Sequence, residues 1–263
     1  MRIISFNAAP VAALAYRNSK PGGGGTFVAS LPVFNATVDF LPAGLDAVVL
    51  TSDLQGRELS GPRLVGEALA PWLVSEGIVS RPDHTIVLLA GDLYASPRAD
   101  ERGSTGDVRT VWRAFANTFG AVAGVAGNHD LFGDQTMEAF AKSEAVHLLD
   151  GACATLRGLR VGGVSGIVGK TTKPNRKDDE TFIRLLEDVL LDTPDVVVLH
   201  QGPDGASPRD KGSASVRATL TAVEAPPIVV FGHCHWEAPF LEEGRSQLVN
   251  VDGRVVVLRA GSA

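Results

Sequence analysis

The sequence predicts an α/β fold with a largely parallel sheet, and two patterns indicate it. Apolar runs rich in valine alternate along the chain with segments in which apolar residues recur at helical spacing. The apolar runs are nearly continuous, which is typical of strands that are covered on both faces. Strands that alternate with helices form βαβ units, and such units place successive strands side by side in parallel.

The expected elements follow one another without a linker of domain size. Five valine-rich strands are expected to end near residues 52, 90, 126, 199 and 231. Helical periodicity predicts helices over residues 62–75, 108–119, 135–143, 178–191 and 213–223. We therefore expect a single domain over residues 1–263, in which residues 1–45 form an N-terminal extension of unknown role.

The C-terminal part of the chain is expected to be antiparallel. Short strand-like runs at residues 238–241, 247–251 and 254–259 are separated by Glu-Gly and Asp-Gly. These dipeptides are typical of hairpin turns, so the sequence predicts a meander of three strands.

Glycine and proline mark the remaining turns and loops. Residues 153–156 and 160–164 are expected to form a hairpin around Gly158. Residues 19–26 contain four consecutive glycines, and residues 95–107 are polar and rich in charge, so both segments are predicted to be loops. The arginines in and after the second loop belong either to a mobile charged surface or to a lid over a substrate.

The composition limits the classes of partner. With 44% apolar and 21% charged residues, the 263-residue chain is ordinary for a globular protein. The formal net charge of −6 does not favour nucleic acid or an anionic membrane as a partner, although a local metal centre keeps a nuclease open. No apolar run approaches the ~18 residues of a membrane span. The two cysteines, Cys153 and Cys234, are expected to be small buried hydrophobes, which fits a cytoplasmic location.

Potential metal ligands follow each of the five predicted strands. The segments are Ser52-Asp53-Leu54-Gln55, Gly91-Asp92, Gly127-Asn128-His129-Asp130, His200 and Gly232-His233-Cys234-His235. In parallel sheets, sites form at the carboxyl ends of the strands, so these side chains should converge. One aspartate after one strand is usually a helix cap, but the same arrangement after five strands indicates a site. The adjacent glycines should let backbone and ligands pack closely.

The ligand types predict a catalytic centre with two divalent ions. Carboxylate, amide carbonyl and imidazole suit Mn, Fe or Zn, whereas the cysteine-rich set of structural zinc is absent from the sequence. The candidates are too many for one ion, and two ions that share a carboxylate would use them all. They are Asp53, Asp92, Asn128, His200, His233 and His235.

In order and spacing, these motifs resemble those of the calcineurin-like metallophosphoesterases. All five blocks occur in the family's order between residues 53 and 235, and Gly-Asn-His-Asp together with Gly-His-x-His is the most specific part. The resemblance implies a four-layer α/β/β/α sandwich of two mixed β-sheets flanked by helices. It also implies hydrolysis of phosphomonoesters or phosphodiesters by a metal-activated water.

The resemblance assigns roles to the ligands one by one. Asp92 would bridge the two metals, and Asp53 and His235 would bind the first. The second metal would be bound by Asn128, His200 and His233. Cys234 lies between two of these histidines, and we expect its side chain to point away from the metals because neighbours in an extended segment alternate.

His129 and Asp130 are the candidate catalytic residues. By resemblance, His129 is not a ligand but contacts the phosphate and can protonate the leaving oxygen. Asp130 is expected to orient or tune His129.

Gln55 departs from the family pattern, which usually has histidine at this position. Three interpretations stay open. Gln55 ligates a metal through its carbonyl oxygen, it holds a metal-bound water, or the first metal site is weak or vacant.

The leading hypothesis is thus a phosphoesterase, and the sequence does not choose between diesters and monoesters. Without an obvious capping domain, the site should be open, which favours a small-molecule phosphoester or nucleotide as substrate. The alternative is a binding or scaffold protein on the same fold with weakened catalysis, for which Gln55 is the supporting feature. Metal-dependent hydrolysis of amides or esters would need a different pattern, such as a clustered His-x-His-x-Asp-His, which is absent from the sequence. The oligomeric state stays open.

Overall fold

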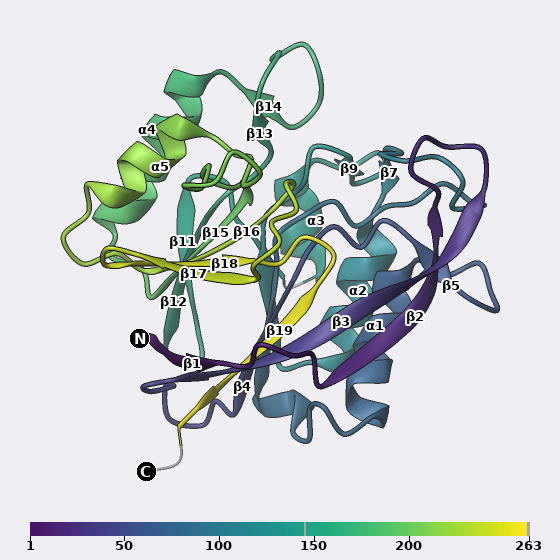
Figure 1. Cartoon of the computed structure of the whole chain (residues 1–263), viewed down its shortest axis with the longest axis horizontal. Coiled ribbons are helices and arrows are strands. Elements are labelled where there is room, and N and C mark those ends of the chain that lie inside the picture. The colour runs from purple at the N-terminus through teal and green to yellow at the C-terminus, as the bar shows by residue number, and fades with distance from the viewer. Residues whose placement is uncertain (145, 262–263) are drawn as a thin grey trace.

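Two β-sheets pack face to face, and helices cover the outer face of each (Figure 1). The structure is a computed structural model that describes residues 1–144 and 146–261. Helices α1 (Val65–Ser75), α2 (Arg109–Thr118) and α3 (Met137–Glu144) lie on the first sheet. Helices α4 (Asp179–Leu191) and α5 (Ala214–Thr221) lie on the second sheet. The predicted four-layer sandwich of two mixed sheets is therefore confirmed.

The first sheet has the strand order β10-β8-β6-β4-β19-β3-β2-β5, and β1 pairs with β3. In that order the strands are β10 (His147–Leu148), β8 (Ala121–Gly124), β6 (Thr85–Leu89), β4 (Ala47–Thr51), β19 (Val255–Ala260), β3 (Thr26–Val38), β2 (Ala12–Ser19), β5 (Arg57–Glu58) and β1 (Ile3–Phe6). Strands β4, β6 and β8 are parallel, so their carboxyl ends lie at one edge.

The second sheet has the order β11-β12-β15-β16-β18-β17. Its strands are β11 (Ala152–Leu156), β12 (Leu159–Val164), β15 (Val196–Gln201), β16 (Ile228–Gly232), β18 (Ser246–Asn250) and β17 (Phe240–Glu243). Two short pairs lie outside both sheets, β7 (Gly106–Asp107) with β9 (Asp130–Leu131) and β13 (Ile167–Val168) with β14 (Arg176–Lys177). The expected hairpin around Gly158 is confirmed as β11 and β12.

The central strands of both sheets are apolar on both faces because they contribute to two cores. On β4, Val49 packs in the core under α1 and α2, while Val48 packs in the core between the sheets. On β15, Val198 faces that central core and Val197 faces α4 and α5. This two-sided burial explains why the strands appear in the sequence as continuous apolar runs.

All five predicted helices are present, with ends within three residues of those expected. Two begin at side-chain caps. The Asp178 carboxylate accepts a hydrogen bond from the Thr181 backbone N–H at 2.8 Å, and Ser213 caps α5 in the same way.

The C-terminal meander is the part of the fold that the sequence predicted wrongly. Strands β17 and β18 form the expected hairpin, but β19 leaves it and lies between β3 and β4 in the first sheet. The reason is the apolar run at its start, since Val255 and Val257 pack in one core while Val256 and Leu258 pack in the other. Such a strand needs cover on both faces, which a meander at the sheet edge does not provide.

The two cysteines are free and half-buried, so both are more exposed than expected. Among the described residues, no helix combines the length and the apolar character that crossing a membrane requires.

Candidate active site

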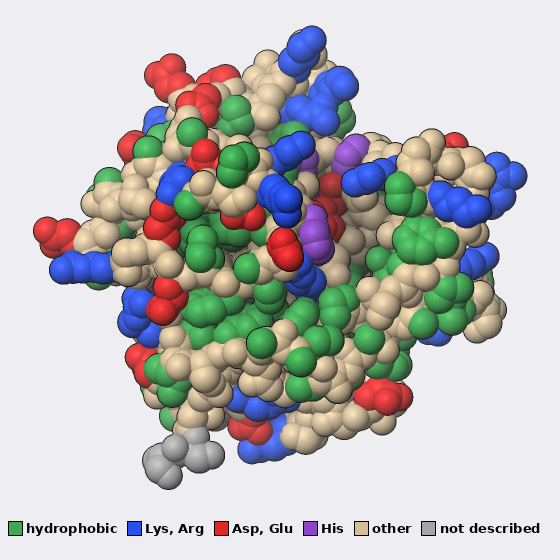
Figure 2. Space-filling model, in the orientation of Figure 1, with side chains coloured by type: hydrophobic (Ala, Val, Ile, Leu, Met, Phe, Trp, Pro, Cys, Tyr) green, Lys and Arg blue, Asp and Glu red, His purple; other side chains and the backbone are tan. Residues whose placement is uncertain are grey.

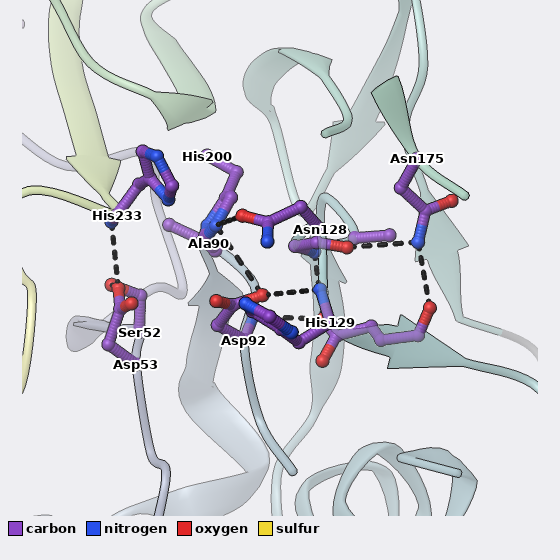
Figure 3. A network of polar contacts seen from close by, with 12 residues as sticks. Ser52, Asp53, Ala90, Asp92, Asn128, His129, Asn175, His200 and His233 are labelled. Carbon is purple, nitrogen blue, oxygen red and sulfur yellow. Dashed lines mark hydrogen bonds and ion pairs between the residues drawn. The ribbon is translucent and has the colours of Figure 1, made fainter. Parts of the chain in front are cut away.

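The carboxyl ends of strands from both sheets meet at one place and bring five of the predicted ligands close to one another (Figure 3). Asp53, Asp92 and Asn128 come from the segments after β4, β6 and β8 of the first sheet. His200 lies on β15 and His233 directly follows β16, both in the second sheet. The site is therefore built from both sheets, whereas the sequence pattern predicted that the ligands would converge at one edge of a single sheet.

Sharp turns aim these side chains into the site. Asp53, Asp92 and His233 have positive φ angles of 52°, 54° and 66°. The left-handed region costs a residue other than glycine free energy, and such strain concentrates at functional sites. The strain here occurs at three predicted metal ligands.

Two motif glycines allow the close packing that the sequence predicted. A Cβ atom at Gly127 would lie 2.1 Å from Oδ1 of Asp92. A Cβ atom at Gly232 would lie 2.3 Å from Oδ2 of Asp53. Any side chain at either position would displace a carboxylate of the site.

Asp92, His200 and His233 can together hold a metal ion, because one ligand atom of each lies within 4.8 Å of the others. Nδ1 of His200 lies 2.7 Å from the carbonyl oxygen of Ala90, so this nitrogen is the donor. In the neutral ring, Nε2 then carries a lone pair and is an acceptor. It faces Oδ1 of Asn128 at 3.2 Å and Oδ1 of Asp92 at 3.5 Å.

Three acceptor atoms that face one another require a positive charge between them. In the metal-free site, a proton on His200 supplies this positive charge. Burial lowers the pKa of His200, but the Asp92 carboxylate more than offsets it and the pKa rises to about 10. A divalent cation would replace the proton that His200 otherwise keeps. Burial, followed by the neighbouring His200, lowers the pKa of His233 to about 4, so its ring is neutral and free to ligate.

The two carboxylate oxygens of Asp92 face two different groups of candidate ligands. Burial raises the pKa of its carboxyl, but His200 and His129 lower it to a net value below the usual range. Its Oδ1 accepts the His129 backbone N–H at 2.9 Å and lies on the His200 side. Its Oδ2 accepts a hydrogen bond from Nε2 of Gln55 at 3.0 Å. We call the surroundings of Asn128, His200 and His233 the second-metal position, and those of Asp53, Gln55 and His235 the first-metal position.

The candidate ligands of the first-metal position are not assembled in one group. Oδ2 of Asp53 accepts hydrogen bonds from the Ser52 hydroxyl at 2.6 Å and the His233 backbone N–H at 3.0 Å. Burial and the Asp252 carboxylate raise the pKa of Asp53 well above its usual value. The excess of negative charge suits a cation.

His235 does not join the group around Asp92. Its Nδ1 lies 3.1 Å from the Asp252 carbonyl oxygen, its Nε2 lies 3.0 Å from the Arg254 guanidinium, and 60% of its side chain is exposed. Its expected role as a ligand of the first metal stays a prediction, and that role requires the ring to release Arg254. Gln55 turns its amide nitrogen toward Asp92, so ligation through its oxygen requires the amide to rotate.

The candidate catalytic residues have different surroundings. Nδ1 of His129 lies 3.0 Å from the Thr105 hydroxyl, and the ring lines the cleft. The buried Asp130 carboxylate accepts three backbone N–H groups, from Asp92 at 2.9 Å, Leu93 at 2.8 Å and Gly127 at 2.8 Å. Asp130 thus contacts the backbone of the turns that carry Asp92 and His129, whereas Thr105 contacts the His129 ring. That Asp130 orients or tunes His129 stays a prediction. Burial and then the Asp92 charge raise the pKa of Asp130 to about 6.

Sequence reasoning missed several contributors. Asp252 pairs by a β-bridge with Ser52 and lines the cleft beside Asp53, but its Asp-Gly sequence was interpreted as a hairpin turn only. Asn175 donates from its amide to the carbonyl oxygens of Gly127 and Asp130, at 2.9 and 2.7 Å. Thr105 lies in a segment predicted as loop, and no local pattern marks either residue as part of the site.

The candidate site opens into a cleft of about 860 Å³. Ligand pockets commonly have volumes of roughly 300–1,000 Å³. The cleft is lined by Asp53, Gln55, Asp92, His129, His233 and His235, together with residues of β2 and β3. Figure 2 shows histidines exposed in this hollow, with basic side chains close to them.

Comparisons with known proteins bear on the fold and on the family. Among solved structures, the Thermus thermophilus protein TT1561 has a TM-score of 0.53 at 15% identity over 79% of this chain and 89% of its own. The sulfate thiohydrolase SoxB of the same genus has a TM-score of 0.49 at 13% identity, over 84% of this chain and 58% of its own. The first of these likenesses shows the fold. No curated protein matches in sequence.

A family match covers most of the chain and contains every predicted ligand. Residues 47–237 match the calcineurin-like phosphoesterases, which is more than half of the 263 residues. The match begins at β4 and ends just after the Gly-His-Cys-His segment. The chain belongs to the calcineurin-like phosphoesterase family.

Proposed function

We propose that this chain hydrolyses phosphoesters at a centre of two divalent metal ions. The observation that carries the proposal is the meeting of three acceptor atoms at the second-metal position, from Asp92, Asn128 and His200. A cation there satisfies all three, and His233 completes the set. The Asp92 carboxylate reaches toward both positions, as a shared ligand must.

Each protein group has a task in this reaction. Bound divalent ions supply Lewis acidity, which polarises the phosphoryl group and lowers the pKa of the attacking water. The protein orients the ligands from rigid strand ends, and Asp130 fixes the turns that carry them. Thr105 engages Nδ1 of His129, which leaves Nε2 to carry a proton to the leaving oxygen.

The substrate class follows from the shape of the site. The cleft is open to solvent, which supports a small or accessible phosphoester such as a nucleotide. The metals are Mn, Fe or Zn by ligand type. Monoester or diester preference is to be measured, and the cytoplasmic location stays a prediction.

The test combines elemental analysis with turnover. Purified protein is analysed for Mn, Fe and Zn, and then assayed with bis-p-nitrophenyl phosphate and p-nitrophenyl phosphate after addition of Mn²⁺. We expect close to two ions per chain and hydrolysis of at least one ester. No turnover with any of the three metals, in protein with an intact fold, would contradict the proposal.

A second candidate is a binding protein with weakened catalysis. The state of the first-metal position favours it, because the Gln55 amide nitrogen faces Asp92 and His235 contacts Arg254. In that case, one ion binds, phosphate or phosphoesters bind, and no ester is hydrolysed.

A further inference from the structure

The N-terminal hairpin of β2 and β3 forms a wall of the active-site cleft, although it lies outside the residues that match the family. The family match begins at residue 47, whereas β3 ends at Val38. Tyr16 and Asn18 of β2 and Phe27 and Ala29 of β3 line the same cleft as Asp53 and His129. Figure 1 shows β2 and β3 as a long hairpin that reaches beyond the rest of the first sheet.

One face of this hairpin is continuous from the core into the cleft. In the antiparallel pairing, Tyr16 lies opposite Ala29 and Asn18 lies opposite Phe27, so these four side chains share a face. The same face continues along β3 to Leu31, which is 1% exposed under α1. Tyr16 is 6% exposed, but Phe27 at the far end is 42% exposed. The protein thus covers this apolar face up to the cleft and leaves its last aromatic ring open there.

The polar groups next to Phe27 are already engaged within the hairpin. The Asn18 amide donates to the Tyr16 hydroxyl at 3.2 Å, and its oxygen accepts the Ser19 backbone N–H at 2.7 Å. Phe27 therefore adds a partly exposed aromatic side chain to the lining of the cleft. The same cleft is lined by the carboxylate and imidazole groups of the site and by Arg102.

We propose that Phe27 forms a subsite for an aromatic organic group of the phosphoester, while the phosphoryl group lies at the metals. An aromatic ring packs on another ring with good surface contact, in offset or edge geometry. Stacking of a planar base on an aromatic side chain strengthens binding by roughly tenfold or more. The inference rests on the proposed function, because it assumes that the phosphoryl group binds beside Asp53 and His233.

The test uses two phosphonates that differ only in the organic group. Phenylphosphonate and methylphosphonate carry a C–P bond that a phosphoesterase does not cleave, so their binding is measured without turnover. Calorimetry with the Mn²⁺-loaded protein gives both Kd values. We expect phenylphosphonate to bind about tenfold more tightly than methylphosphonate.

Three variants then assign the preference to one ring. Phe27→Ala should remove most of the preference and leave the methylphosphonate Kd unchanged. Phe27→Tyr should keep it, because the ring face remains. The matched control is Phe40→Ala, since Phe40 is 48% exposed and does not line the cleft. This control should behave as the wild type, and thermal denaturation of each variant should show an intact fold.

The outcomes separate the subsite from the function. A preference that persists in Phe27→Ala, or that the wild type lacks while binding both phosphonates, would overturn the subsite and leave the phosphoesterase proposal standing. Absence of binding for both phosphonates in metal-loaded protein would count against the phosphoryl site itself, and the subsite would fall with it.

Discussion

The two proposed metal positions of this site differ in how their candidate ligands are held. At the second-metal position, His200 and Asn128 are buried and come from strand ends of both sheets. At the first-metal position, Gln55 replaces the family's histidine and His235 is exposed and contacts Arg254. The difference teaches that strand ends in a packed core preorganise a ligand set, whereas segments at the rim leave ligands engaged with protein groups until a metal competes for them.

The largest effect is expected at Asp92, because it serves both positions. Asp92→Asn removes the shared negative charge and should lower kcat/KM by about a thousandfold or more. Steady-state hydrolysis of bis-p-nitrophenyl phosphate measures it, with thermal denaturation as the control for folding. Activity near that of the wild type would show that neither position depends on a bridge.

His233 and His235 lie two residues apart and allow the second-metal and first-metal positions to be compared directly. His233→Ala should abolish the tighter metal-binding step, since it removes a ligand of the gathered set. His235→Ala should weaken only the looser step, by about 10- to 100-fold. Calorimetric titration of metal-free protein with Mn²⁺ distinguishes the two. Equal losses in both variants would mean that the positions are not distinct.

His129 lies beside both positions and should affect chemistry without affecting metal content. His129→Asn should slow esters with poor leaving groups by about a hundredfold, and those with good leaving groups less, because the proton supplied to the leaving oxygen matters most there. Rates for a series of aryl phosphate diesters measure the dependence. Equal slowing across the series would exclude an acid role for this ring.

The smallest of these changes is expected at Gln55. Gln55→His restores an imidazole at the first-metal position and should tighten the looser step by about tenfold, because imidazole is the better ligand for these ions. The affinity of the tighter metal-binding step should not change. Gln55→Asn is the matched control, since it keeps an amide and should not tighten the step.

The candidate ligand residues could be singled out from the sequence because they lie at or shortly after the ends of buried strands. A continuous apolar run such as that before Asp92 indicates where the strand ends, and the next residues must then lie at the edge of the sheet. Sequence pattern could not show that Asp130 binds backbone amides, or that Thr105 holds His129, because both contacts depend on how loops close over the sheet.

The sheet partners of two regions were also beyond sequence reasoning. Strand β19 follows an Asp-Gly turn signal, but burial on both of its faces takes it into the first sheet. The N-terminal hairpin could not be placed at the cleft, because strand pairing between β3 and β19 joins residues more than 200 positions apart. Local periodicity carries no information on such contacts.

The central claim is that the chain binds two metal ions with unequal strength, tightly at the second-metal position and more loosely at the first. Calorimetric titration of the metal-free wild-type protein with Mn²⁺ tests it most directly. The structure predicts two separate steps that sum to two ions per chain, with the first step markedly tighter. Two steps of equal affinity, or no tight step at all, would contradict this account of the site.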